Sequence, residues 1–500
     1  MNFLIKNVSS INRVSILLML FSFSSTAQTL FNKRIKKLNV SETAYSVLVK
    51  GNSFFVFGGE YYNYGTTTNI RYLTMKLDSL ADTLYTKSYG KIEHDFYPGY
   101  WGGACFLNNS SYDFGTKADS LNHPTNILYK FTAIGDTTFT KVSNDTFNNY
   151  GSSVKVARNQ SLILLGSFDS INPNYDFSLI HTDTLGNIKF QKHYGTSNPE
   201  NPCTIDTCKD GGFIMCGWRQ TGGFTYVAYV VKTDSLGGLQ WQNTYGNNAG
   251  VAIFTEKKGG YIITACYQDS LVGADAYTRA NLIKIDNSGS VVWDKKYGSS
   301  GYGTAAVISY ELPNGDIISC GKQWHPNSSG SSFSYGIYGF IMKTDSLGNL
   351  KFYQTYQADT FNGAQNYLYD IKPLAGGGFI AVGFVQPNDG TTQDVWVLRV
   401  DSNGCEVAGC SSGTGIEHVT DINNQVNIYP NPASNSFRVV WIDNNQKKTV
   451  QIYDVNSKIV LTQTMYSKTT IDVSNLNEGI YNISIVSNEG VVNKRVVIVR

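Results

Sequence analysis

The sequence predicts an all-β protein, a seven-bladed β-propeller followed by a small β-sandwich. The main observation is a recurring turn, in which an apolar run ends in an acidic residue and a short strand closing on Tyr-Gly usually follows. The turns begin at Asp78, Thr132, Asp183, Asp234, Asp286, Asp345 and Asp401. Their spacing of 51 to 59 residues is typical of propeller blades and exceeds the period of helical or leucine-rich arrays.

Composition favours the same class. The 500 residues include 48 Gly, 33 Tyr and 26 Phe but only 11 Pro, and 16% are charged. This balance suits many short antiparallel strands joined by tight turns. The formal net charge of +2 creates no large field that would attract nucleic acid or an acidic membrane surface. We therefore expect neither nucleic acid nor another polyanion as a partner.

The first element is predicted to be a secretory signal peptide, residues 1–27. Lys6 and Arg13 form a basic start, residues 14–23 are apolar, and small residues end the segment at Ala27. The alternative is a permanent membrane anchor, but this apolar run is only about half of the roughly 20 residues that a span needs. No later segment is long enough either, so we expect no transmembrane span in the mature protein.

The propeller is expected over residues 28–410, with four strands in each blade. In the copy from Val251 to Gly298, a hairpin turn joins two strands, the third strand ends at Asp286 and the fourth runs to Tyr297. The Asp can accept hydrogen bonds from turn amides and the Gly takes the positive φ that the turn needs, so turn chemistry explains the motif without catalysis. The third strands are expected at residues 71–78, 125–132, 176–183, 227–234, 279–286, 338–345 and 394–401.

The N-terminus is expected to complete the last blade. No strand closing on Tyr-Gly follows Asp401, whereas residues 31–38 form an unassigned strand before the first repeat. Pairing that strand with the last blade would close the ring and remove two exposed sheet edges. The outer residues Trp241, Trp293 and Phe352 are expected to pack between blades.

Strand direction sorts the loops onto two faces. Turns between strands one and two and between three and four are short and lie on one face; loops between strands two and three and between blades vary in length and lie on the other. Variable loops on a rigid scaffold are where binding is expected, and aromatic side chains that merely cap the blades are an equally weighted alternative. The candidate binding-face residues are Tyr61, Tyr62, Tyr64, Tyr112, Trp218, Tyr267, Trp324 and His325.

Eight cysteines suit an exported protein, in which disulfides persist. Cys405 and Cys410 lie close together after the last blade and are predicted to form one disulfide. The cysteines in apolar strands are expected to be packed thiols. No Cys-x-x-Cys spacing occurs and the six His are scattered, so the sequence predicts no catalytic residue, cofactor or metal site.

The turn with a Trp four residues after its Gly, as in Gly237 to Trp241 and Gly289 to Trp293, resembles the tryptophan-docking motif of quinoprotein-like propellers. That family has one more residue between the Asp and the Gly. Its enzymes use calcium, acidic residues and an adjacent Cys pair that this sequence lacks. The resemblance therefore implies the fold alone.

The C-terminal segment, residues 426–500, follows a Ser/Gly/Asn-rich linker at 411–425 and is expected to be a separate β-sandwich. Its motifs are Tyr429-Pro430-Asn431-Pro432, the turn with Leu476, Gly479 and Tyr481, and a basic last strand with Lys494 and Arg495. The segment resembles the C-terminal sorting domain of type IX secretion cargo from Bacteroidetes-type bacteria. That resemblance implies an immunoglobulin-like sandwich that the type IX machinery recognises and that is commonly removed after export. An eighth blade is the alternative, but the Asp turn is missing.

We therefore expect a propeller, secreted or on the outer-membrane cell surface, that binds an unknown glycan, protein or small-molecule ligand. The alternative is an enzyme acting on polysaccharide or a small molecule at the central channel, because propellers host both functions. Charged side chains with perturbed pKa values at the channel mouth would favour the enzyme.

Overall fold

The computed structural model describes residues 30–64, 67–91, 94–99, 102–118, 124–141, 149–169, 175–223, 225–272, 275–298, 302–324, 336–360, 363–388, 391–407, 426–441, 448–454, 458–487 and 490–500. The predicted signal peptide and linker lie outside these ranges. All regular elements within them are strands. None of the described segments is therefore a helix of the length and apolarity that a membrane span requires.

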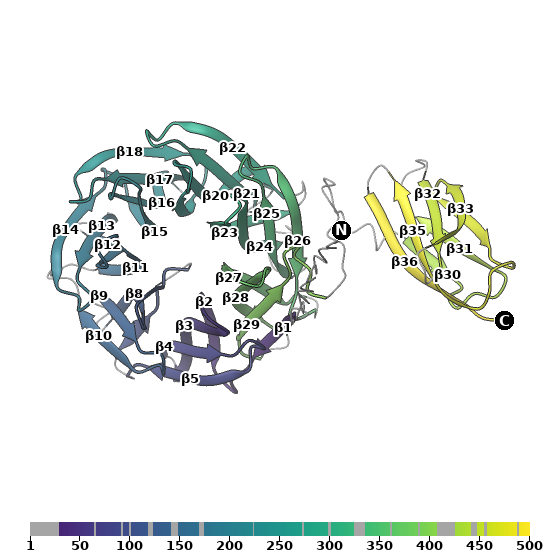
Figure 1. The fold of residues 1–500 in the computed structure, drawn as a ribbon, viewed down its shortest axis with the longest axis horizontal. Helices are drawn as coiled ribbons and strands as arrows, with labels where there is room; N and C mark the ends of the chain where they lie inside the picture. The colour runs from purple at the N-terminus through teal and green to yellow at the C-terminus, as the bar shows by residue number, and fades with distance from the viewer. Residues whose placement is uncertain are drawn as a thin grey trace, which may run out of the picture.

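Residues 31–400 form a ring of antiparallel sheets, with the first strand of each sheet toward the centre and the fourth at the rim (Figure 1). The first sheet contains β2 (Ser41–Lys50), β3 (Ser53–Tyr64), β4 (Thr67–Leu77) and β5 (Thr83–Tyr89). The second contains β6 (Asp95–Tyr97), β7 (Cys105–Leu107), β8 (Ser110–Ala118), β9 (Pro124–Phe131) and β10 (Thr137–Lys141). Its inner strand is split into β6 and β7, which both pair with β8.

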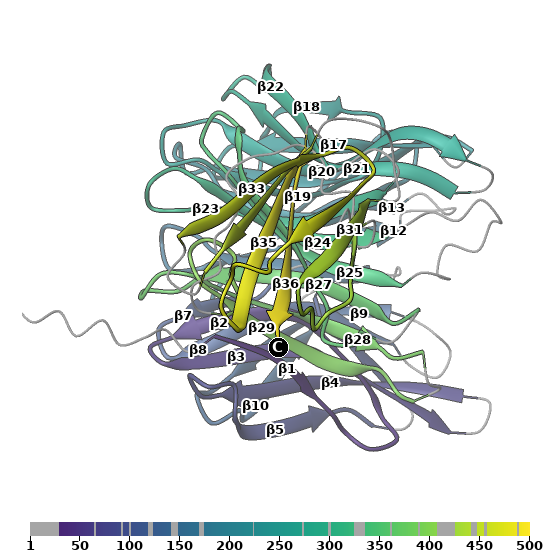
Figure 2. The same cartoon turned by 90° about the vertical axis from the view of Figure 1, so that its right-hand side faces the viewer.

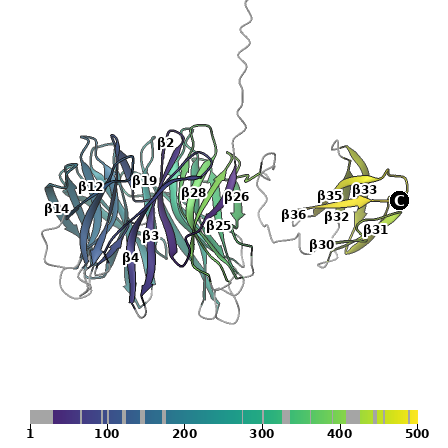
Figure 3. The same ribbon diagram turned by 90° about the horizontal axis from the view of Figure 1, so that it is seen from below.

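Three regular four-stranded sheets follow. The third sheet contains β11 (Asn149–Val156), β12 (Leu162–Asp169), β13 (Tyr175–Thr182) and β14 (Ile188–Tyr194). The fourth contains β15 (Glu200–Thr207), β16 (Phe213–Gly222), β17 (Thr225–Thr233) and β18 (Leu239–Tyr245). The fifth contains β19 (Gly250–Thr255), β20 (Tyr261–Val272), β21 (Asp275–Ile285) and β22 (Val291–Tyr297). Seen edge-on, the strands cross the thickness of the ring (Figure 3).

An eight-stranded sheet completes the ring and consists of two four-stranded units. One unit contains β23 (Gly303–Glu311), β24 (Ile317–Trp324), β25 (Ile337–Thr344) and β26 (Leu350–Tyr356). The other contains β27 (Gln365–Pro373), β28 (Phe379–Gln386), β29 (Asp394–Val400) and the N-terminal β1 (Phe31–Ile35). A single parallel bridge, Ile337 to Gln365, joins the two units. Radially arranged antiparallel sheets of this kind define a β-propeller.

The N-terminal strand closes the ring as predicted. β1 pairs antiparallel with β29, from Phe31 opposite Arg399 to Ile35 opposite Val395. The strand ends at Ile35 rather than Leu38, because the chain turns there to enter β2 and leaves Leu38 exposed. β1 therefore covers the edge that β29 would otherwise expose at this junction.

The recurring Asp turn has the predicted chemistry. Asp234 Oδ1 accepts hydrogen bonds from the amides of Leu236 (2.8 Å) and Gly238 (2.7 Å), and Gly237 has a φ of 76°. The same pair of bonds forms at Asp78, Asp183, Asp286, Asp345 and Asp401. In the degenerate copy, the Thr132 hydroxyl replaces the carboxylate and accepts from the Asp136 amide (3.1 Å).

A Tyr at the end of the outer strand, usually the Tyr of the Tyr-Gly motif, links several sheets to the next one. The Tyr245 hydroxyl donates to the carbonyl of Gly289 in the neighbouring sheet (2.7 Å). Equivalent bonds join Tyr194 to Gly237 (2.6 Å), Tyr297 to Gly348 (2.8 Å) and Tyr356 to Gly404 (2.6 Å). The rings of Trp241, Trp293 and Phe352 lie against the same turn glycines of the next sheet, which confirms that they pack between sheets. The two motifs recur together because they contact each other.

Apolar side chains fill the space between neighbouring sheets. Ile214 and Val230 of the fourth sheet pack with Ile263 and Ile283 of the fifth in one buried cluster. Strands covered on both faces in this way need apolar residues throughout, which explains their lack of alternation. Cys105, Cys203, Cys208, Cys216 and Cys320 are buried free thiols and Cys266 is a half-buried one, so the strand cysteines are packed as predicted.

Residues 426–498 form two sheets. One contains β30 (Val426–Tyr429), β31 (Ser436–Trp441) and β34 (Lys468–Asp472); the other contains β33 (Ile459–Met465), β32 (Lys448–Tyr453), β35 (Gly479–Ser487) and β36 (Gly490–Ile498) (Figure 2). Trp441 from the first sheet and Ile483 and Val496 from the second share one hydrophobic core. The segment has its own core and contributes no strand to the ring.

Candidate functional site

The predicted aromatic residues do not converge. Tyr61 and Tyr62 lie in β3, Trp218 in β16, Tyr267 in β20 and Trp324 at the end of β24, all near the long-loop face but in different sheets. Most pack within their own sheet: the Tyr61 hydroxyl bonds to that of Tyr45 (2.7 Å), Trp218 contacts Tyr226, and Lys296 lies over the Tyr267 ring. Tyr64 ends β3, but its side chain lies outside the described part, as does His325.

The placement of Tyr112 on the long-loop face was wrong. Tyr112 lies in β8 opposite Cys105, close to the short turn that joins β7 to β8, and is 2% exposed. Its side chain belongs to the core cluster that contains Phe114. The physical reason is that the short turn at Asn108 joins the first and second strands of this sheet, so Tyr112 begins the second strand at its short-turn end.

The inner strands carry a β-bulge at an equivalent level. The extra residues are Tyr45, Ser152, Cys203, Val251, Val307 and Tyr369. Three positions further along, toward the short-turn face, lie Leu48, Lys155, Asp206, Phe254, Tyr310 and Lys372. A bulge re-aims the side chains that follow it. Four of these six residues line a single cavity.

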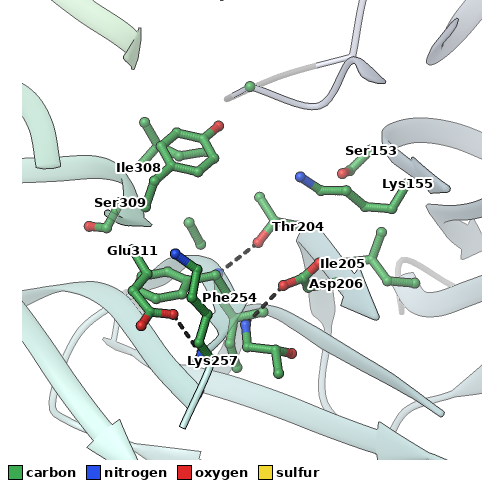
Figure 4. A pocket seen from close by; sticks show the side chains of 15 residues that line it. Ser153, Lys155, Thr204, Ile205, Asp206, Phe254, Lys257, Ile308, Ser309 and Glu311 are labelled. Atoms are coloured by element: carbon green, nitrogen blue, oxygen red, sulfur yellow. Dashed lines mark hydrogen bonds between the residues drawn. The ribbon is translucent and has the colours of Figure 1, made fainter. Parts of the chain in front are cut away.

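The cavity, of about 250 Å³, lies at the short-turn end of the inner strands β11, β15, β19 and β23 (Figure 4). Ser153 and Lys155 face Ser309 and Glu311 across it. Its remaining lining residues include Gly102, Thr204, Asp206, Phe254, Thr255, Lys257 and Tyr310. Hydroxyl groups and charges of both signs from several sheets therefore meet in one space.

The chain between β6 and β7 leaves its sheet and lines the cavity at Gly102. The Gly102 amide donates to the Tyr45 carbonyl (3.1 Å), and the Gly103 carbonyl accepts from Val154 (2.9 Å). Gly102 has a φ of 67°, and a Cβ here would lie 2.5 Å from the Tyr310 hydroxyl. Only glycine fits this close approach without strain.

A hydrogen-bond network around Asp370 forms one wall of the channel. The buried Asp370 carboxylate accepts from the Val47 amide (2.8 Å), the Tyr310 hydroxyl (2.9 Å) and the Lys372 ammonium (2.7 Å). Burial raises the pKa of Tyr310 and lowers the pKa of Lys372. Because β2, β23 and β27 each contribute a member, this network stabilises the ring beside its closure.

Asp206 links two neighbouring inner strands. Its carboxylate accepts from the amides of Thr255 (2.8 Å) and Thr207 (2.9 Å), and the Thr204 hydroxyl accepts from Ile253 (2.9 Å). Burial raises the pKa of Asp206, although the nearby Lys155 and the amide bonds oppose this shift. Asp206 is thus a carboxylate at the cavity that already has structural partners.

Two cavity groups on β11 lack partners. The Ser153 hydroxyl oxygen is buried without a hydrogen bond. Within the described part of the chain, Lys155 makes no hydrogen bond or ion pair, and its ammonium points into the cavity. Buried polar groups are nearly always satisfied in native proteins, so the Ser153 hydroxyl is available to a ligand, and the half-buried Lys155 ammonium faces the same space.

The described residues contain no group of three or more His, Cys, Asp or Glu side chains arranged to hold a metal ion. The sequence did contain a signal for the cavity. Lys155, Asp206, Phe254, Tyr310 and Lys372 each stand five residues before the last residue of a strand-one-to-two turn. Aligning the copies on this turn would have identified them as equivalent positions.

The sorting motifs meet in the C-terminal sheets. Asn431 donates to the Arg495 carbonyl (2.9 Å) and accepts from the Val497 amide (2.9 Å), so the Tyr-Pro-Asn-Pro segment is bound to β36. Leu476 packs against the core, and the Tyr481 hydroxyl donates to the Asn477 carbonyl (2.9 Å). Pro430 and Pro432 follow cis peptide bonds, Tyr429 is exposed, Gly479 begins β35, and Lys494 lies in β36.

The fold and these motifs define an exported β-propeller protein. Residues 427–499 match the family model described as the secretion system C-terminal sorting domain. This is the sorting tail of type IX secretion cargo, so the chain carries a signal for export to the cell surface or the medium. No curated protein matches the chain significantly.

Several solved structures are similar to the ring. The β-propeller domain of the Trilobed protease from Pyrococcus furiosus has a TM-score of 0.41 and 5% identity, over 72% of this chain and 95% of that one. The α-L-arabinofuranosidase of Fusarium graminearum has a TM-score of 0.40 and 10% identity, over 74% and 98%. A protein of unknown function from Dyadobacter fermentans has a TM-score of 0.40 and 7% identity, over 75% and 99%. Their activities are properties of those proteins.

Proposed function

We propose that the chain is an exported binding protein that holds a small polar ligand in the channel cavity. In this proposal the ring is a seven-bladed propeller over residues 28–410, with the eight-stranded sheet counted as two blades. The signal peptide 1–27 delivers the chain to the periplasm, and an immunoglobulin-like sandwich over 426–500 directs it outward. The likeness to quinoprotein-like propellers extends no further than the fold.

The observation that carries the proposal is the pair of unpartnered groups on β11. Ser153 and Lys155 stand on one strand, at a cavity where the Thr255 hydroxyl is also buried without a hydrogen bond and where Thr204 and Asp206 hold neighbouring strands together. The ligand site therefore lies at the short-turn end of the channel instead of the long-loop face that the aromatic residues suggested. A ligand there would satisfy groups that the fold itself leaves open.

The cavity limits the size of the ligand. Pockets for drug-sized molecules span about 300–1,000 Å³, and this cavity has about 250 Å³. It suits one monosaccharide-sized unit, either free or at the end of a longer molecule. A glycan end fits an extracellular location and the hydroxyl groups of the lining.

Calorimetric titration of the full exported chain with a panel of neutral and acidic sugars tests this proposal. Ser153→Leu fills the cavity and should abolish binding, whereas Thr86→Leu, on the exposed outer strand β5, should bind like the wild type. Equal unfolding midpoints would show that both variants fold. Binding that survives Ser153→Leu in a folded protein would place the ligand elsewhere and refute the proposal.

An enzyme acting at the same cavity is the second candidate. The observation that favours it is Asp206, a cavity carboxyl whose pKa burial raises, since such groups occur at catalytic sites. Its bonds to two strand amides favour a structural role instead. A hydrolase panel on the exported protein separates the two: turnover that Asp206→Asn abolishes without loss of fold would establish the enzyme.

A further inference from the structure

Basic residues lie at the mouth of the channel, on turns of the first, third, fourth and fifth sheets. Lys50, Arg158, Lys209, Lys257 and Lys258 are exposed on the turns that join the first and second strands; we call them the basic collar. Lys50 donates to the Asn108 carbonyl (3.4 Å) and Lys257 to that of Leu312 (3.2 Å), each in the neighbouring sheet. Arg158 and Lys209 reach the next turn in the same way. Neutral carbonyl partners leave the charges of the collar uncompensated.

The acidic residues nearby are mostly paired with other cations. Asp210 pairs with Lys232 (2.7 Å), Glu256 with Lys284 (2.9 Å), Asp316 with Lys351 (2.6 Å) and Asp370 with Lys372 (2.7 Å). Asp206 and Glu311 remain, and both accept backbone amides. Among the inner strands and the turns that follow them, Lys155 and the basic collar therefore outnumber these two carboxylates, although the chain as a whole carries only +2.

We propose that the ligand is a hydroxylated monocarboxylate of monosaccharide size, that is, a uronic acid. This inference rests on the proposed function and names the ligand class for the same cavity. The carboxylate would bind Lys155, a cation of the cavity wall that has no hydrogen bond or ion pair within the described part of the chain. The sugar hydroxyls would bind the Ser153 hydroxyl and the carboxylates of Asp206 and Glu311, which accept hydrogen bonds.

The cavity favours one negative charge over two. Asp206 and Lys155 line the same cavity, so that carboxylate would repel a dianion such as phosphate more strongly than a monoanion. The backbone amides of the inner strands are committed to their ladders and to Asp206, so they cannot cradle a phosphate. The basic collar raises the local concentration of anions and directs them into the channel.

The test compares D-galacturonate with D-galactose, which differ only in the carboxylate. In titrations of the full exported chain, galacturonate should bind at least tenfold more tightly, and added salt should weaken that binding. Lys155→Met should remove the preference. Lys87 lies on the outer strand β5 and pairs with Asp136, so Lys87→Met should keep the preference for galacturonate. Tighter binding of an oligogalacturonide than of the monomer would identify the ligand as a chain end.

The outcomes separate the two claims. Equal binding of both sugars, unaffected by Lys155→Met, would overturn the uronate inference and leave the channel site intact. If Ser153→Leu leaves galacturonate binding unchanged, or no sugar binds at all, both claims fail. Should Lys155→Met not fold, the double variant Lys209→Gln/Lys258→Gln changes exposed collar residues alone. It should weaken galacturonate binding several-fold without affecting galactose, and an unchanged affinity would overturn the inference.

Discussion

One arginine in the N-terminal strand adds buried ion pairs to the β1–β29 ladder that closes the ring. The Arg34 guanidinium bonds to Asp394 (2.6 and 3.0 Å) and to Asp359 (2.6 Å), and the side chains are only 17%, 3% and 14% exposed. Arg34→Met keeps the length of the side chain but leaves both carboxylates without this partner. In the described part of the chain, the other cation paired with Asp394 is Lys36, at 4.0 Å. Breaking a buried pair from one side costs about 3–5 kcal/mol.

The preceding residue of β1 provides a matched control. Lys33 pairs with Asp82 (2.7 Å), which lies just before β5, but these side chains are 38% and 66% exposed. Exposed pairs contribute about 0–1 kcal/mol, so Lys33→Met should be nearly neutral.

Urea unfolding of the full chain measures both variants. The transition can be followed by the fluorescence of buried Trp396, whose indole donates to Asn32 in β1 (2.8 Å). Arg34→Met should lower the free energy of unfolding by several kcal/mol, and Asp394→Asn added to it should restore part of the loss. Equal effects of Arg34→Met and Lys33→Met would refute the reasoning.

Three further predictions concern other parts of the chain. Burial and the facing Glu60 raise the pKa of Glu42 to about 8, so the folded state keeps a proton that the unfolded state releases above about pH 4.5. Between about pH 4.5 and pH 8, the free energy of unfolding of the wild type should therefore fall by about 1.4 kcal/mol per pH unit relative to that of Glu42→Gln. Parallel pH profiles of the wild type and the variant would contradict this. Cys405 is disulfide-bonded, and its predicted partner, Cys410, lies outside the described residues; mass spectrometry of the exported protein should find this pair, and a free Cys410 thiol would exclude it. Truncation after Val492 removes most of β36, so the folded propeller should remain inside the cell envelope. Export of the truncated protein at normal levels would show that the tail is not the export signal.

The fold was largely predictable because its signals are local. Each Asp turn is made by one carboxylate and the amides of its own turn, so a few consecutive residues are enough to recognise it in the sequence. The closing strand was deduced from a missing partner after Asp401, and β1 fills that place. The sorting tail is equally local, since its motifs lie within 75 residues.

The cavity was not predictable in the same way. Its lining comes from four inner strands and from Gly102, which reaches it only because the second sheet splits its inner strand. The sequence of a single repeat predicts neither the split strand nor the ion pairs elsewhere that leave Lys155 without a partner. The sequence-based interpretation placed the binding site at the aromatic residues near the long loops because these residues are easily recognised in the sequence. Tyr112 shows that such an assignment fails where one copy of the repeat is irregular.

Lysine footprinting of the full exported chain, with and without the sugar that binds most tightly, tests the central claim most directly. A ligand in the channel should protect Lys155 from acetylation and leave Lys296, beside Tyr267 near the long-loop face, as reactive as before. Protection of Lys296 with no change at Lys155 would contradict the channel site and return the ligand to the long-loop face.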